Sequence, residues 1–244
     1  MFEQIVQDAR ADRFASWGYS TVIDENIGQP VIERAEFEEL HAAAGLNASH
    51  WPIGNAGLIH VYGYLLSRVE TPYGLKRDRW ESGDLARAFG LPETAFLLGD
   101  AAVAGETVLQ RVTAVLLAHL EHPGESRGDI LTFDDGLGDG QELLFRTVVV
   151  RAPSHSPAGS GESVVPAAAS AAVSASAAPV VPGALVYGVH DGERMRAITT
   201  FPLASVSTSS LNALQHDPPR MRYNAALPPG ARSTLPPRSP LLRL

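Results

Sequence analysis

The sequence predicts an α+β domain in which N-terminal helices pack on one face of a small antiparallel sheet. In the first half of the chain, apolar residues recur at steps of three and four, the spacing of one face of an amphipathic helix. In the second half, two strand-like runs flank Asp191-Gly192, a strong hairpin signal. Helices followed by strands, rather than alternating with them, are typical of the α+β class.

Helical periodicity is clearest at 106–120, where apolar residues form a broad face, and it recurs at 1–15, 34–44, 58–70 and 84–89. The helix that begins at Leu58 should stop at Glu70, because Pro72 disfavours helical geometry at the residue before it. Thr71–Gly74 then fits a turn. Gly63 costs this helix about 1 kcal/mol relative to alanine, which indicates that a backbone or a ligand packs closely against it.

Strands are expected at 19–23, at 143–150 and in both arms of the 184–203 hairpin, with a possible last strand at 220–227. The strand at 143–150 and the hairpin should form a three-stranded antiparallel sheet. On the second arm one face is apolar and the other is partly cationic, since Met195, Ala197, Thr199 and Phe201 alternate with Arg194, Arg196, Ile198 and Thr200. The acidic stretch 134–140 is interpreted as a glycine-rich turn, because Leu137 stands where a calcium loop needs an oxygen ligand.

Two segments lack the composition of a folded core. Residues 153–182 are almost only alanine, serine, proline, glycine and valine, which predicts a disordered linker or inserted loop. Residues 228–244 form a proline-rich tail that is also predicted to be disordered. Residues 1–152 and 183–227 should therefore form a single α+β domain.

Composition excludes several classes of protein. The 244 residues carry a formal net charge of -8 and no cysteine, which argues against a nucleic-acid binder, disulfides and thiolate chemistry. No apolar run approaches the ~20 residues needed to span a bilayer, and the N-terminus does not resemble a secretory signal. His119 and His122 lack the spacing of a zinc helix. We therefore expect a soluble, cytoplasmic protein without metal, cofactor or membrane association.

The candidate site lies in residues 51–80, which contain two of the three tryptophans and the only lysine of the chain, Lys76. His60 and Tyr64 are one helical turn apart and share a face. Lys76, Arg77 and Arg79 follow the turn together. An imidazole, phenols and a cationic turn are the groups that a small anionic ligand would need.

The first hypothesis is therefore an enzyme or a ligand-binding protein for a small anionic molecule, and the sequence leaves open which of the two it is. His60 would be the general acid or base, and Tyr64 or Tyr73 a proton donor. Lys76, with an amine that can act as nucleophile or base, would form the anion clamp together with four arginines: Arg77, Arg79, Arg194 and Arg196. This requires His60 and Lys76 to face one hollow roofed by the sheet.

Other interpretations fit the same residues. His60 can be a buried imidazole bonded to backbone, and Lys76 can lie on a solvated turn. A non-catalytic interaction module would use the Trp51–Trp80 surface and bind a protein partner through the proline-rich tail. Segment 82–99 also looks like a helix-turn-helix, but a second helix from Pro92 would offer no cation to phosphate, so nucleic-acid binding is only a minor alternative.

Overall fold

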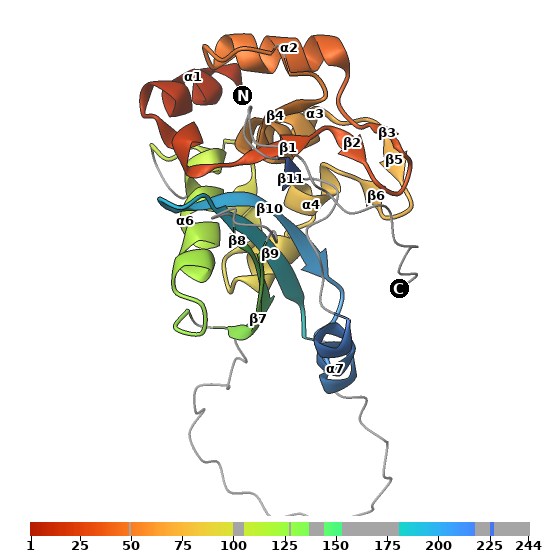
Figure 1. Cartoon of the computed structure of the whole chain (residues 1–244). Coiled ribbons are helices and arrows are strands. Elements are labelled where there is room, and N and C mark those ends of the chain that lie inside the picture. The colour runs from red at the N-terminus through yellow and green to blue at the C-terminus, as the bar shows by residue number, and fades with distance from the viewer. Residues whose placement is uncertain are drawn as a thin grey trace, which may run out of the picture.

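The computed structural model describes residues 1–48, 50–99, 105–126, 128–136, 144–152, 181–217 and 225–226. It confirms the α+β class (Figure 1). In this view α1 and α2 lie at one end of the molecule and α7 at the other, with a four-stranded sheet between them and α6 alongside it. Apart from Val181 and Pro182, the two segments predicted to be disordered, 153–182 and 228–244, lie outside the described residues.

The helical elements are α1 (Phe2–Arg10), η1 (Arg13–Ser16), α2 (Arg34–Ala43), η2 (Leu58–Gly63), α3 (Tyr64–Leu66), α4 (Asp78–Glu81), α5 (Asp84–Ala88), η3 (Glu93–Phe96), α6 (Val108–Glu121) and α7 (Thr208–His216). The expected helices at 34–44, 84–89 and 106–120 are confirmed. Helix α6 begins where the Thr107 side chain accepts a hydrogen bond from the Gln110 backbone N–H at 3.1 Å.

The helix expected over 58–70 is shorter and wider than predicted. Leu58–Gly63 forms a π-helix, Tyr64–Leu66 continues it as one α-helical turn, and Ser67 is extended. The predicted stop at Glu70 is wrong, because Glu70 pairs instead with Leu75 in a small hairpin. The close contact predicted at Gly63 is the Ile32 side chain, whose Cδ1 would lie 2.2 Å from an added Cβ.

The strands are β1 (Tyr19–Thr21), β2 (Ile23–Asp24), β3 (Gln29–Pro30), β4 (Ile53–Asn55), β5 (Glu70–Thr71), β6 (Gly74–Leu75), β7 (Asp129–Gly136), β8 (Leu144–Arg151), β9 (Gly183–His190), β10 (Met195–Leu203) and β11 (Ala225–Ala226). The main sheet has the antiparallel order β10-β9-β8-β7, and a second sheet has the order β11-β1-β4. The turn predicted from Asp134 is wrong up to Gly136, because these residues continue β7; residues 137–140 lie outside the described residues. Arg146 on β8 pairs with Asp134 at 2.7 Å, which supports the fourth strand.

A β-bulge interrupts the predicted alternation on β10. The register shifts between Ala197 and Thr199, so Ile198 has no partner residue on β9. Ala197, Ile198 and Thr199 are all buried, so the expected division of β10 into an apolar and a partly cationic face ends at the bulge. The bulge also releases the Ile198 carbonyl from the ladder, which makes it available to a side chain from another element.

One hydrophobic cluster runs through the described elements from α1 to β10. Helices α5 and α6 contact the main sheet, and η2 lies between α2 and β4. A buried carboxylate ties three elements together: Asp8 accepts from Arg13 at 2.9 Å and from the Tyr62 and Thr107 hydroxyls at 2.5 Å each. Within the described residues, none of the helices is both long and apolar enough to cross a membrane.

Candidate functional site

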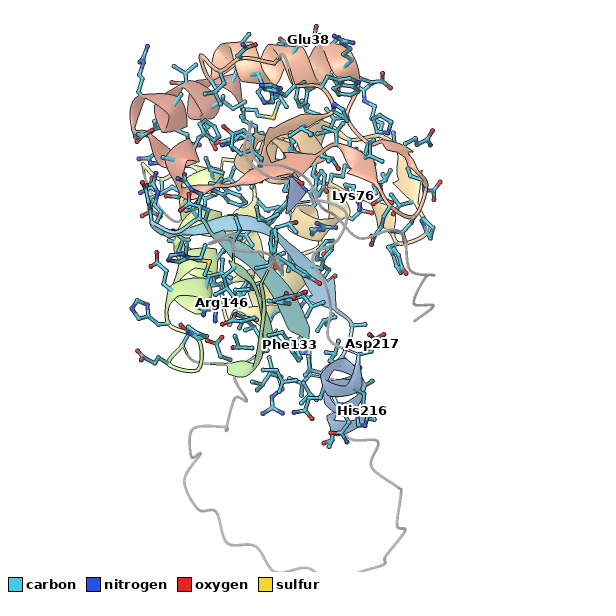
Figure 2. All side chains as sticks on the ribbon, viewed as in Figure 1. Glu38, Lys76, Phe133, Arg146, His216 and Asp217 are labelled. Carbon is cyan, nitrogen blue, oxygen red and sulfur yellow. The ribbon has the colours of Figure 1, made fainter. Side chains whose placement is uncertain are left out.

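Four side chains from three parts of the fold meet beside the main sheet: Asp24 from β2, Tyr64 from α3, Lys76 from the link between β6 and α4, and Arg79 from α4. We call them the Lys76–Arg79 cluster. Figure 2 labels Lys76, which lies close to α4. The β5–β6 hairpin turns the chain at Gly74, whose φ of 83° suits glycine, and this directs Lys76 inward.

Lys76 is buried in an ion pair with Asp24. The two residues are only 7% and 3% exposed, and Asp24 also accepts a hydrogen bond from the Asn26 backbone N–H at 2.9 Å. Burial alone would raise the pKa of Asp24, but the hydrogen bond and charge of Lys76 together with Asn26 lower it below its ordinary value. The carboxylate is therefore ionised at neutral pH.

Arg79 reaches the sheet without an acidic partner. Its guanidinium donates to the Thr199 hydroxyl at 3.3 Å, and its Cζ lies 4.2 Å from the ring centroid of Phe201 and 5.0 Å from that of Tyr64. Within the described part of the chain it forms no ion pair with a carboxylate. Burial lowers the pKa of Arg79, although Tyr64 and Asp24 oppose this effect. The cation is stabilised mainly by aromatic faces and by the hydroxyls of Thr199 and Tyr64.

The cluster thus holds two cations and one carboxylate. The pKa of both partners of the ion pair is lowered, with opposite consequences for their charge. The lowered pKa of Asp24 favours its charged form, whereas burial and then the charge of Arg79 lower the pKa of Lys76 and favour its neutral form. Glu25 is exposed by area and adds negative charge nearby, but it forms no ion pair with Lys76. Partial desolvation of its carboxyl group and the charge of Asp24 raise its pKa. The interior here carries an excess of positive charge.

His60 lies next to the cluster but is sealed from solvent. It is 0% exposed, and its Nδ1 lies 2.6 Å from the Ile198 carbonyl that the bulge releases. Because a carbonyl can only accept, Nδ1 carries the proton and Nε2 accepts from the Ser20 hydroxyl at 3.2 Å. Burial lowers the pKa of His60 to about 3. The hydrogen bond to Ile198 opposes this shift, and the charges of Arg79 and Lys76 add to it. The imidazole is neutral, and both nitrogens are already bonded.

Three of the predicted site residues, His60, Lys76 and Arg79, contact the ring of Tyr64. Its centroid lies 4.9 Å from the ring centroid of His60 and 5.6 Å from the Lys76 Nζ. The Tyr64 ring also contacts Arg79. Burial raises the pKa of Tyr64 to about 12, while the charge of Arg79 opposes the rise. His60 and Lys76 therefore both lie near the ring of Tyr64, but the fully buried imidazole does not open onto the hollow that was expected between them.

Four other predicted residues have contacts elsewhere. Tyr73 is 69% exposed at the tip of the β5–β6 hairpin. Arg77 is exposed and lies 4.0 and 3.9 Å from carboxylate oxygens of its helical neighbours Asp78 and Glu81. On the sheet, Arg194 is exposed beside the hairpin turn, and Arg196 pairs with Asp191 and donates to the Ala15 carbonyl at 2.6 Å. Of the proposed clamp, Lys76 and Arg79 are the members that meet.

Sequence reasoning missed two contributors to this region. Asp24 gave no signal of its own, although a single buried lysine requires a carboxylate from somewhere in the chain. Tyr187 on β9 lies edge-on to Phe201, with ring centroids 5.4 Å apart, and burial followed by the charge of Glu25 raises its pKa. Thr199 and Phe201 were expected on one face of β10, and both contact Arg79 from that face.

The segments on which the two alternative hypotheses depend, Trp51–Trp80 and 82–99, differ in the structure from what those hypotheses require. Trp80 is 2% exposed and donates to the His60 carbonyl at 3.0 Å, while Trp51 packs edge-on against Phe37. The second helix predicted from Pro92 is wrong: Glu93–Phe96 forms a single 3-10 turn followed by an extended residue. The turn is stabilised instead by an ion pair between Arg87 and Glu93 at 2.5 Å.

The described elements define an α+β protein in which buried Asp24, Tyr64 and Lys76 and half-buried Arg79 meet beside an antiparallel sheet. Among the residues the structure describes, no group of three or more histidine or acidic side chains is arranged to hold a metal. Comparisons with models of known protein families, with curated proteins and with solved structures gave no significant match. Function must therefore be argued from the cluster itself.

Proposed function

We propose that the protein binds a small anionic molecule at the Lys76–Arg79 cluster. The observation that carries this proposal is the guanidinium of Arg79, which forms no ion pair with a described carboxylate, next to a lysine that already pairs with the one carboxylate of the cluster. Buried charges in proteins are normally paired, because an isolated charge loses its hydration without compensation. An anionic ligand would supply the charge that the fold leaves out.

The surroundings of Arg79 suit such a ligand. A guanidinium presents a planar fork of donors that matches a carboxylate or a phosphate, and its hydrogen-bonding neighbours here, Thr199 and Tyr64, offer neutral hydroxyls. The rings of Tyr64 and Phe201 flank it and exclude water, which strengthens an ionic hydrogen bond. We expect the ligand to be a small anion of the cytoplasm.

Binding is supported better than acid–base chemistry at His60. A general base needs a free nitrogen and a pKa near the working pH. The His60 nitrogens are occupied by Ile198 and Ser20, and the pKa of about 3 keeps the ring neutral. Its contacts fit a role in positioning η2 against the bulge of β10.

A thermal-shift screen of the full chain with phosphate, sulfate and small carboxylates tests the proposal. A ligand at 100 times its Kd adds about 2.7 kcal/mol of stability, which for a chain of this size raises Tm by roughly 5–10 °C. Arg79→Gln should lose this rise. Arg77→Gln is the matched control, since it removes an exposed arginine two residues away and should keep it.

Two results would overturn the proposal. One is that no anion raises Tm at concentrations up to the millimolar range. The other is that Arg79→Gln, shown by circular dichroism to be folded, retains the same ligand-dependent rise as Arg77→Gln. In that case the anion would bind elsewhere on the protein.

A further inference from the structure

The only lysine of the chain is also buried in an ion pair with a carboxylate. Of the 19 basic residues, all but Lys76 are arginine, and arginine also supplies the exposed position next to it, Arg77. An arginine cannot lose its proton in a protein, whereas a lysine amine can, and a neutral amine is a nucleophile. The one position with an amine is thus the position beside the unpaired guanidinium.

We propose that the Lys76 amine forms a Schiff base with the carbonyl group of a 2-oxo acid whose carboxylate is held by Arg79. This inference rests on the proposed function and names its ligand class. The Lys76 Nζ and the Arg79 Cζ lie 5.6 and 5.0 Å from the centroid of the Tyr64 ring, and the charge of Arg79 acts on Lys76. The proposed ligand spans these two groups. A 2-oxo acid carries its carbonyl next to its carboxylate, which matches two cations on one ring.

The neighbours of Lys76 supply what the reaction requires. Asp24 contacts the amine directly and can exchange protons with it. Lys76 is buried but keeps 7% exposure, whereas His60 keeps none, so the Lys76 side chain is less completely enclosed than the imidazole. Burial and the adjacent cation Arg79 lower the pKa of Lys76, which favours the neutral, reactive form, and this is the arrangement that activates lysines in other carbonyl-binding sites.

The step balances without any oxidant or reductant. Asp24 accepts a proton from the ammonium, the freed Nζ lone pair forms a bond to the carbonyl carbon, and the carbonyl oxygen takes that proton. A second proton passes from Nζ through Asp24 to the hydroxyl, the C–O bond breaks and water leaves. Ammonium and carbonyl thus give an iminium and water, and the Asp24 carboxylate, restored at the end, pairs with the iminium.

Borohydride trapping tests the inference directly. The native full-length chain is incubated with glyoxylate, pyruvate or 2-oxoglutarate and treated with sodium borohydride, which reduces an imine to a stable secondary amine. The expected product, by intact mass and peptide mapping, is one adduct of at least one of these acids on Lys76. Besides Lys76, the other primary amine of the chain is its N-terminus at Met1, so the map assigns the adduct without ambiguity.

Four controls make the result specific. Lactate, which has the carboxylate but no carbonyl, should give no adduct. Lys76→Arg should lose the adduct, and the same treatment in urea should lower the Lys76 labelling of the wild-type chain at least tenfold. Arg79→Gln should slow labelling of Lys76 about tenfold or more, because the carboxylate loses its partner.

The outcomes separate the inference from the proposed function. If lactate raises Tm but none of the three 2-oxo acids labels Lys76 in the native chain, the Schiff base is refuted and anion binding stands. If labelling occurs only at Met1, or equally in urea, the Schiff base is also refuted. If neither a Tm rise nor labelling is seen, both proposals are wrong.

Discussion

The ion pair between Asp24 and Lys76 gives the sharpest test of the charge arrangement, because removing either partner leaves the other charge in a different electrostatic environment. Asp24→Asn leaves Lys76 buried without its carboxylate partner and still under the charge of Arg79. Lys76→Met leaves an aspartate that still accepts from the Asn26 N–H at 2.9 Å and still feels the charge of Arg79. The first change should therefore cost more than the second.

The expected sizes follow from burial. Removing one member of a buried ion pair costs about 3–5 kcal/mol, because the other charge stays buried without a partner. Asp24→Asn should lie at the upper end, about 4–5 kcal/mol, and Lys76→Met near 3 kcal/mol. The double variant should cost less than the sum of the two by roughly 2–3 kcal/mol, the coupling expected of contacting residues.

Urea denaturation of the four proteins, the wild type, both single variants and the double variant, measures these terms. With m-values of about 1–3 kcal/mol/M, the single variants should move the midpoint by roughly 1–4 M without a change in m. Costs that add within about 0.5 kcal/mol would show that the two groups do not interact. A larger cost for Lys76→Met than for Asp24→Asn would refute the excess of positive charge.

Three further predictions concern buried groups elsewhere. Gly63→Ala should destabilise the fold by about 1–3 kcal/mol in urea despite the better helix propensity of alanine, since the new Cβ meets Ile32; a stabilised variant would contradict this packing. Tyr62→Phe should cost about 1–3 kcal/mol, because Asp8 loses one of its donors, and a cost below 0.5 kcal/mol would contradict that bond. Because the folded pKa of His60 is about 3 and the unfolded value near 6.5, the unfolded state binds more protons between these values. The unfolding free energy should thus fall by about 1.4 kcal/mol per pH unit from roughly pH 6 to pH 4, and a folded His60→Gln variant with the same pH slope would contradict the buried neutral imidazole.

The sequence predicted the elements whose own residues determine them. Helix α6 buries a continuous apolar face, and the turn at Asp191 carries the residues that such hairpins need, so both follow from local pattern. Gly63 was informative for the same reason, since a glycine inside a helix needs a neighbour to explain it. The neighbour was the side chain of Ile32, which no local pattern could name.

The site was predicted only in part, because its geometry depends on contacts between distant segments. Arg77 and Arg79 look alike in sequence, but residues two apart do not face the same side of a helical turn, so α4 directs Arg79 to the sheet and Arg77 to solvent. The bulge at Ile198 has no glycine or proline to announce it, yet it fixes His60. The pairing of Lys76 with Asp24 likewise appears only once β2 is placed.

Charged groups in this fold differ in how completely their charge is compensated, and this difference supports a functional reason for the cluster. Asp8 is fully enclosed and is compensated by three donors, from Arg13, Tyr62 and Thr107. A chain that satisfies one buried charge so completely does not leave another imbalance through poor packing. A core selected for stability alone would gain by replacing Lys76 with an apolar residue, because well-packed hydrocarbon commonly matches or exceeds a buried ion pair. The structure instead keeps an amine and a guanidinium side by side at a cost in stability, and perturbed charges of this kind concentrate where proteins bind ligands or react with them.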